Sequence, residues 1–186
     1  MDQLDPDTRA ILNGHFVSIN SQGAKGERAV LDGRDLNRVD FKSIDLSGTS
    51  LRGIDFTGAN LDGAAFAMSD LSGARLDKAN LCMADMPGAN MTDCSLIEAN
   101  LKLANLRPED ILNTDDNPTG STWAANLTAA DLTGANLEGG RLDGANLRDA
   151  KFTNAWLVKA NFTDAIIDGA EFDGADMRKT IMPEAA

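Results

Sequence analysis

Residue types that commonly act in catalysis or metal binding, or that fill large cores, are scarce in this chain. Its 186 residues include no tyrosine, one histidine and two cysteines, and aromatic residues make up only 5%. The core must therefore be built mainly from small and aliphatic side chains. One histidine and two separated cysteines cannot supply a nucleophile–histidine–acid triad or a metal cluster, and no glycine-rich phosphate loop is present. We expect no catalysis, no cofactor and no metal site.

Basic residues and long apolar runs are also scarce. Lysine and arginine number 17 against 29 aspartates and glutamates, which gives a net charge of -12. This charge argues against direct binding of nucleic acid or of an anionic membrane surface. No stretch approaches the ~20 apolar residues that span a bilayer, and residues 1–7 lack the features of a secretory signal. We expect a soluble cytoplasmic protein whose thiols, Cys82 and Cys94, stay reduced and unbridged.

A period of five residues dominates what is present. A Leu, Phe, Met or Ile, termed the centre of a repeat, recurs at every fifth position from Leu31 to Leu106 and from Leu127 to Met177, with 16 and 11 centres. Alanine stands two places before the centre in 19 of these 27 repeats, and Asn or Asp directly precedes it in 17. Five is the period of neither a helix nor a strand. Each short unit must bury its apolar pair by stacking on its neighbours, which predicts a solenoid.

The repeated motif, as in Ala59-Asn60-Leu61 and Ala145-Asn146-Leu147, resembles that of the pentapeptide-repeat family over roughly 135 residues. The resemblance implies an all-β solenoid, namely a right-handed, four-sided (quadrilateral) β-helix with four repeats per coil and about seven coils. Twenty residues per coil then place the centres in inward ladders. The residues expected in this core are Leu31, Phe41, Leu51, Phe56, Leu61, Phe66, Leu81, Leu101, Leu127, Leu137, Leu147, Phe152, Phe162 and Phe172.

The ends and one interruption divide a single continuous domain. Asp5 as N-cap and Pro6 in the first turn predict a capping helix within 1–28, where His15 is a packing or surface residue. Arg34 takes an inward place that is usually small, so it either pairs under this cap or extends to solvent. The remaining segments are a first repeat run (29–108), an inserted loop (109–124), a second run (125–182) and a tail (183–186).

The inserted loop is either a tolerated insertion at a corner or a functional element. Pro108-Glu109-Asp110 predicts a helical turn at its start. Asp115-x-Asn117-x-Thr119-Gly120 resembles the start of a calcium loop, but Asn126 replaces the twelfth-position Glu, so no metal is expected. Apolar residues at outward positions are either scattered surface residues or contacts. The candidate partner contacts are Met83, Leu103, Asp115, Asp116, Trp123, Trp156, Val158 and Ile166.

The far end of the solenoid lacks a cap. The residues that follow Met177 are too few for a second capping helix, so the last coil is left open. A homodimer joined through the C-terminal coils would cover it, and the family resemblance supports this expectation. The candidate dimer residues are Phe172, Met177, Ile181 and Met182.

Two functions of different classes fit these features. The first is a non-catalytic scaffold or protein-binding module whose cellular partner is unknown. The second, implied by resemblance to quinolone-protection members of the family, is a DNA-mimicking regulator of DNA gyrase and topoisomerase IV. Half of the net charge lies outside the repeats, and signs alternate along the stack Lys42, Asp62, Cys82 and Lys102. A phosphate-like ribbon needs rows of one sign, so the first function is favoured.

Overall fold

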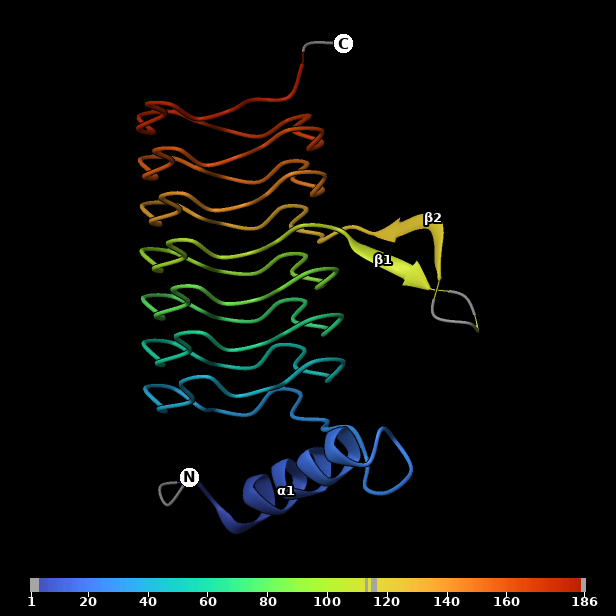
Figure 1. Ribbon diagram of the computed structural model, residues 1–186. Helices are drawn as coiled ribbons and strands as arrows, with labels where there is room; N and C mark the ends of the chain where they lie inside the picture. Colours follow the sequence, from blue (N-terminus) through green and yellow to red (C-terminus); the bar gives the residue numbers. More distant parts are fainter. Residues whose placement is uncertain (1–3, 113, 115–116, 185–186) are drawn as a thin grey trace.

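The computed structural model describes residues 4–112, 114 and 117–184. It is a rod of stacked coils, with a helix across one end and a two-stranded hairpin that projects from the side (Figure 1). The regular elements are α1 (Pro6–Asn20), β1 (Glu109–Leu112) and β2 (Pro118–Trp123). Within the described ranges, no helix is long and apolar enough to cross a membrane.

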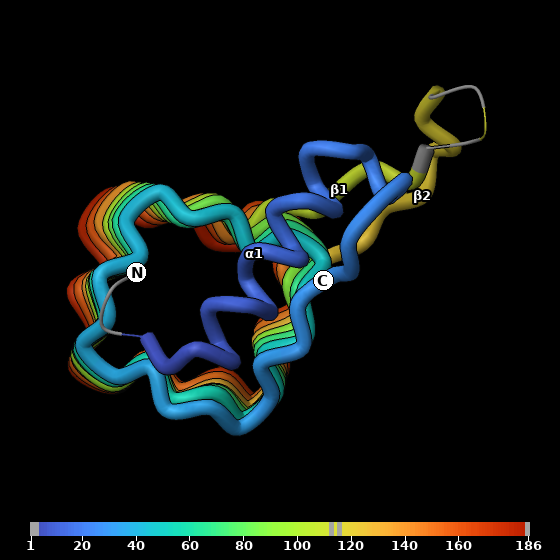
Figure 2. The backbone as a smooth tube through the Cα atoms, turned by 90° about the horizontal axis from the view of Figure 1, so that it is seen from below, coloured from blue at the N-terminus to red at the C-terminus, as the bar shows by residue number. Residues whose placement is uncertain are grey.

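Backbone pairing between successive coils sets the shape of the rod. Parallel bridges join positions twenty residues apart, as in Asn60–Asn80–Asn100, so each coil holds four five-residue repeats. From Leu31 to Phe162, the amide of each centre donates to a carbonyl of the next coil, for example Leu81 N to Asn100 O at 2.7 Å. Seen along the axis, the coils superimpose (Figure 2). Stacking therefore satisfies the backbone groups that a single repeat leaves unpaired.

The centres and the small residues two places before them fill the interior. Of the fourteen residues expected in the core, all but Phe172 are at most 4% exposed. Phe172 is only partly buried because it lies in the last part of the rod, and its ring stacks on Phe152 with centroids 5.1 Å apart. Cys94 takes an inward place, where its thiol donates to Leu71 O at 2.8 Å and burial raises the pKa of Cys94 to about 12. Both cysteines are free.

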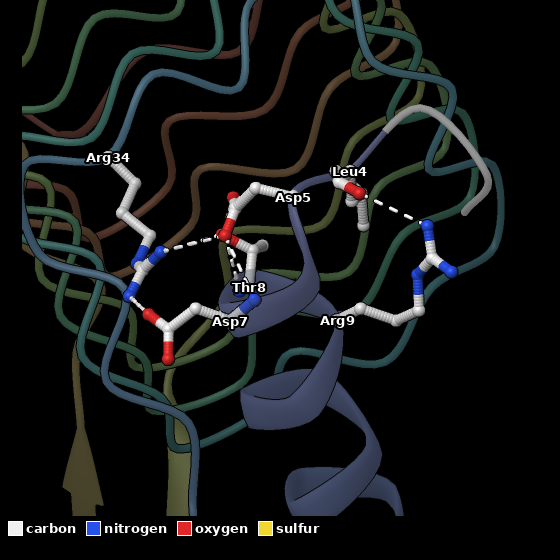
Figure 3. A network of polar contacts seen from close by, with 6 residues as sticks. All are labelled: Leu4, Asp5, Asp7, Thr8, Arg9 and Arg34. Carbon is white, nitrogen blue, oxygen red and sulfur yellow. Dashed lines mark hydrogen bonds and ion pairs between the residues drawn. The ribbon is translucent and has the colours of Figure 1, made fainter.

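Helix α1 covers the first coil (Figure 2). Its N-cap Asp5 accepts hydrogen bonds from the amides of Asp7 and Thr8, each at 3.0 Å. Arg34, on the first coil, donates to Asp7 and to Thr8 Oγ1 at 2.8 Å, and its guanidinium lies 3.6 Å from Asp5 (Figure 3). Of the two alternatives for Arg34, pairing under the cap and extension to solvent, the structure shows the pairing. Its long side chain replaces the usual alanine because the helix start supplies two carboxylates there.

His15 joins the cap to the rod from a fully buried position. The amide of Ala29 donates to Nδ1 of His15 at 3.4 Å, which leaves Nε2 to donate to the carbonyl of Asp45 at 3.2 Å. A neutral imidazole protonated on Nε2 can form both hydrogen bonds. Protonation of the ring would add a hydrogen to Nδ1, which would then face the N–H of Ala29 and lose that bond. Burial lowers the pKa of His15, and the nearby Arg28 also lowers it, while Asp45 raises it.

We expect this histidine to make the rod less stable in mild acid. Because the folded pKa of His15 lies below its ordinary 6.5, the unfolded chain takes up the proton first, so stability is full above 6.5 and falls as pH drops below it. Thermal melts should show that the melting temperature decreases by a few degrees from about pH 7 to pH 5.

His15→Gln should remove this dependence of the melting temperature on pH. An unchanged slope in that variant would assign the effect to other groups; carboxylates with lowered pKa, such as Asp32, lose their stabilisation only at more acidic pH.

The interruption is a β-hairpin, so the predicted helical turn at 108–110 is wrong. Glu109 pairs with Trp123 and Asp110 with Thr122, in antiparallel register. This pairing satisfies backbone groups in a segment that projects away from the rod. Bridges across it, such as Asn90–Asn126, span 36 residues instead of 20, and the difference of 16 equals the length of 109–124. The coil resumes with its register intact.

Pro108 explains why the chain leaves the rod at this point. It stands two places after the centre Leu106, where the turn of the repeat takes a positive φ, as at Met83 (54°) and Leu103 (59°). Proline is restricted to a φ near −65° and cannot make that turn. The hairpin therefore begins where the turn residue is incompatible with the coil.

Candidate partner-binding surface

Two apolar side chains stack at one corner of the rod. Met83 and Leu103 stand at the same place in successive coils and are 56% and 50% exposed. Leu103 Cδ2 lies 2.8 Å from where a Cβ on Gly139 would be, so the leucine covers that glycine in the next coil. Cys82 beside them is half-buried. The corner thus carries an apolar strip over three coils.

A second apolar surface lies at the base of the hairpin. Trp123, at the end of β2, is 55% exposed. Met68, on a coil of the rod near the base of the hairpin, is also exposed. Both approach Gly88, and together with Asp70 and Asn90 they line a surface hollow. Sequence reasoning included Trp123 but missed Met68. The available signal was its place in the repeat, two after a centre, which Met83 and Leu103 share.

The other predicted contacts are dispersed over the rod. Trp156 is 49% exposed and Val158 half-buried, on either side of the buried Leu157. Ile166 is exposed at the outward place before a centre. Asp115 and Asp116 lie outside the described residues. The structure therefore brings Trp123 together with Met68, and Met83 with Leu103, without joining all the candidates into one site.

Charged side chains on the rod pair between coils. Lys102 Nζ lies 2.8 Å from Glu138 Oε2, and this hydrogen bond lowers the pKa of Glu138. Six more ion pairs also link neighbouring coils. They are Lys42–Asp62, Arg52–Asp32, Arg75–Asp55, Lys78–Glu98, Arg107–Asp143 and Arg148–Asp168. The pairs interrupt the rows of like charge that a phosphate-like surface needs.

The end opposite the cap exposes the last coil (Figure 1). Phe172, Met177 and Met182 are partly buried there, and Ile181 is half exposed at an outward place. In the part of the chain that the structure describes, no three His, Cys, Asp or Glu side chains gather to hold a metal ion. The end face therefore leaves partly buried apolar side chains in contact with solvent.

Comparison with known proteins identifies the repeats. The family model for pentapeptide repeats matches eight copies, over residues 35–67, 69–107, 124–149 and 145–182. No curated protein matches the chain.

Several solved structures are similar to the chain. HetL, involved in heterocyst differentiation regulation in the cyanobacterium Nostoc sp. strain PCC 7120, is 29% identical, with 86% of this chain and 81% of HetL covered and a TM-score of 0.44. A trypsin-treated variant of QnrB1, a plasmid-mediated fluoroquinolone resistance protein, is 22% identical over 82% and 78% of the two chains, with a TM-score of 0.40. Rfr23 from the cyanobacterium Cyanothece 51142 is 18% identical over 92% and 99%, with a TM-score of 0.33.

Proposed function

The chain belongs to the pentapeptide-repeat family, and from this premise we propose that it is a non-catalytic scaffold that binds a partner protein through the outside of the rod. The observation that carries the proposal is the placement of large apolar side chains. The interior is filled by the centres, yet Met83, Leu103, Trp123 and Trp156 are each about half exposed. Exposed Trp and Met side chains are common at protein interfaces.

Affinity capture with the full-length chain tests this function. The wild type should retain a specific protein from extracts of its source cells, and a variant with Met83, Leu103, Trp123 and Trp156 all replaced by Ser should lose it. All four side chains are exposed, so the variant should melt close to the wild type. Capture by both proteins alike, or by neither, would contradict the proposal.

The net charge of -12 favours a second candidate, the DNA-mimicking regulator of gyrase and topoisomerase IV. The ion pairs between coils weigh against it, because they neutralise carboxylates on the rod faces. We therefore expect micromolar protein neither to inhibit gyrase supercoiling nor to protect it from a quinolone. Inhibition or protection in that assay would replace the scaffold proposal with this one.

The proposal includes a homodimer joined through the C-terminal coils, with Phe172, Met177, Ile181 and Met182 at its interface. The partly buried end face described above supports it, since a second copy would cover these side chains. We also propose a right-handed coil of about seven turns and a cytoplasmic location, in which Cys82 and Cys94 remain free.

A further inference from the structure

The hollow at the base of the hairpin, here called the hairpin groove, is formed by Met68, Gly88 and Trp123. A Cβ placed on Gly88 would lie 2.5 Å from Met68 Sδ and 3.3 Å from Trp123 Cβ. The two side chains therefore converge over the glycine, one from the rod and one from the hairpin. A side chain at position 88 would fill the space between them.

Local folding does not require either of these apolar side chains. Met68 has a φ of 57°, and a non-glycine residue in this left-handed conformation costs on the order of 1 kcal/mol. Its side chain remains 40% exposed, and the Trp123 indole is more exposed still. Large side chains that stay in water in this way are available to a partner.

The surroundings of the groove are acidic. Asp70 is the one charged side chain among the described residues that line the groove, and Arg28 lines a separate hollow that shares Met68. Glu109 is the register partner of Trp123. Glu109 and Asp110 form no ion pair with any described residue, in contrast to the paired carboxylates on the rod. The negative electrostatic potential of these carboxylates at the groove thus favours a cationic partner.

We propose that the hairpin groove binds an extended, basic segment of a partner protein. An apolar side chain of that segment inserts between Met68 and Trp123. Flanking lysine or arginine side chains face Asp70 and Glu109, and one stacks on the indole of Trp123. This inference rests on the proposed protein-binding function and specifies the chemistry of the partner.

Selection from a phage-displayed library of random dodecapeptides on the immobilised full-length chain tests the groove without a bias in charge. Enriched peptides should carry at least two basic residues beside an apolar one. Synthetic copies should bind about tenfold more weakly to Trp123→Ala. They should also bind several-fold more weakly to Met68→Gly, a variant that removes the side chain and relieves the positive φ. Val30→Ala, which removes a similarly exposed apolar side chain that does not line the groove, should bind as the wild type does.

Three outcomes would overturn the groove assignment. They are the absence of enrichment, enrichment of acidic or uncharged peptides, and equal binding to Trp123→Ala and wild type. If any of these occurred while affinity capture still distinguished the wild type from the four-serine variant, the scaffold function would stand and the groove alone would fail. Loss of that distinction would instead contradict the function itself.

Discussion

Leu81→Asp should unfold the rod. Leu81 is 1% exposed in the middle of the inward ladder that includes Leu61 and Leu101. Loss of a buried leucine side chain costs about 2–5 kcal/mol, and an unpaired buried carboxylate adds several more. Total stability of a domain is only about 5–15 kcal/mol. The substitution also weakens the stacking of the coils on either side of Leu81, because each coil is stabilised by its neighbours.

Circular dichroism during a thermal melt measures this effect. The matched control is Met83→Asp, two residues away, where the native side chain is 56% exposed. The control should melt within a few degrees of the wild type, since aspartate also tolerates a positive φ better than most residues. A Leu81→Asp variant that melted as the control does would refute the inward ladder.

The second large effect is expected on molecular mass. Each chain is 19.7 kDa, and light scattering at micromolar concentration should give twice that value for the wild type. Met177→Asp should give the mass of one chain, because it places a charge in the partly buried end face. Met83→Asp, on the side of the rod, should remain dimeric. A monomeric wild type would contradict the C-terminal dimer.

The sequence predicts the core well because the five-residue period by itself determines which side chains are buried. Every fifth residue faces inward whatever its neighbours are, so Leu81 and Phe152 can be assigned without coordinates.

The interruption could not be predicted in the same way. Antiparallel pairing of Glu109 with Trp123 depends on contact between two segments that carry no repeat. The groove residue Met68 has only a weak signal in the sequence, which is the place two after a centre that it shares with the exposed Met83 and Leu103, because this place accepts many residue types. The burial of His15 depends on the angle at which α1 crosses the first coil, and one histidine in a helix gives no signal of that angle.

The central claim is that the repeats fold into a stable rod without the hairpin, and that partner binding through the outside of this rod requires the hairpin. Removal of 109–124 together with Pro108→Gly tests it most directly, because Leu127 then follows Leu106 by five residues and glycine permits the turn. We measure the melting temperature of this variant and its affinity for the partner captured by the wild type. The account predicts melting within a few degrees of the wild type and loss of partner binding. Full binding by a well-folded variant without the hairpin would contradict it.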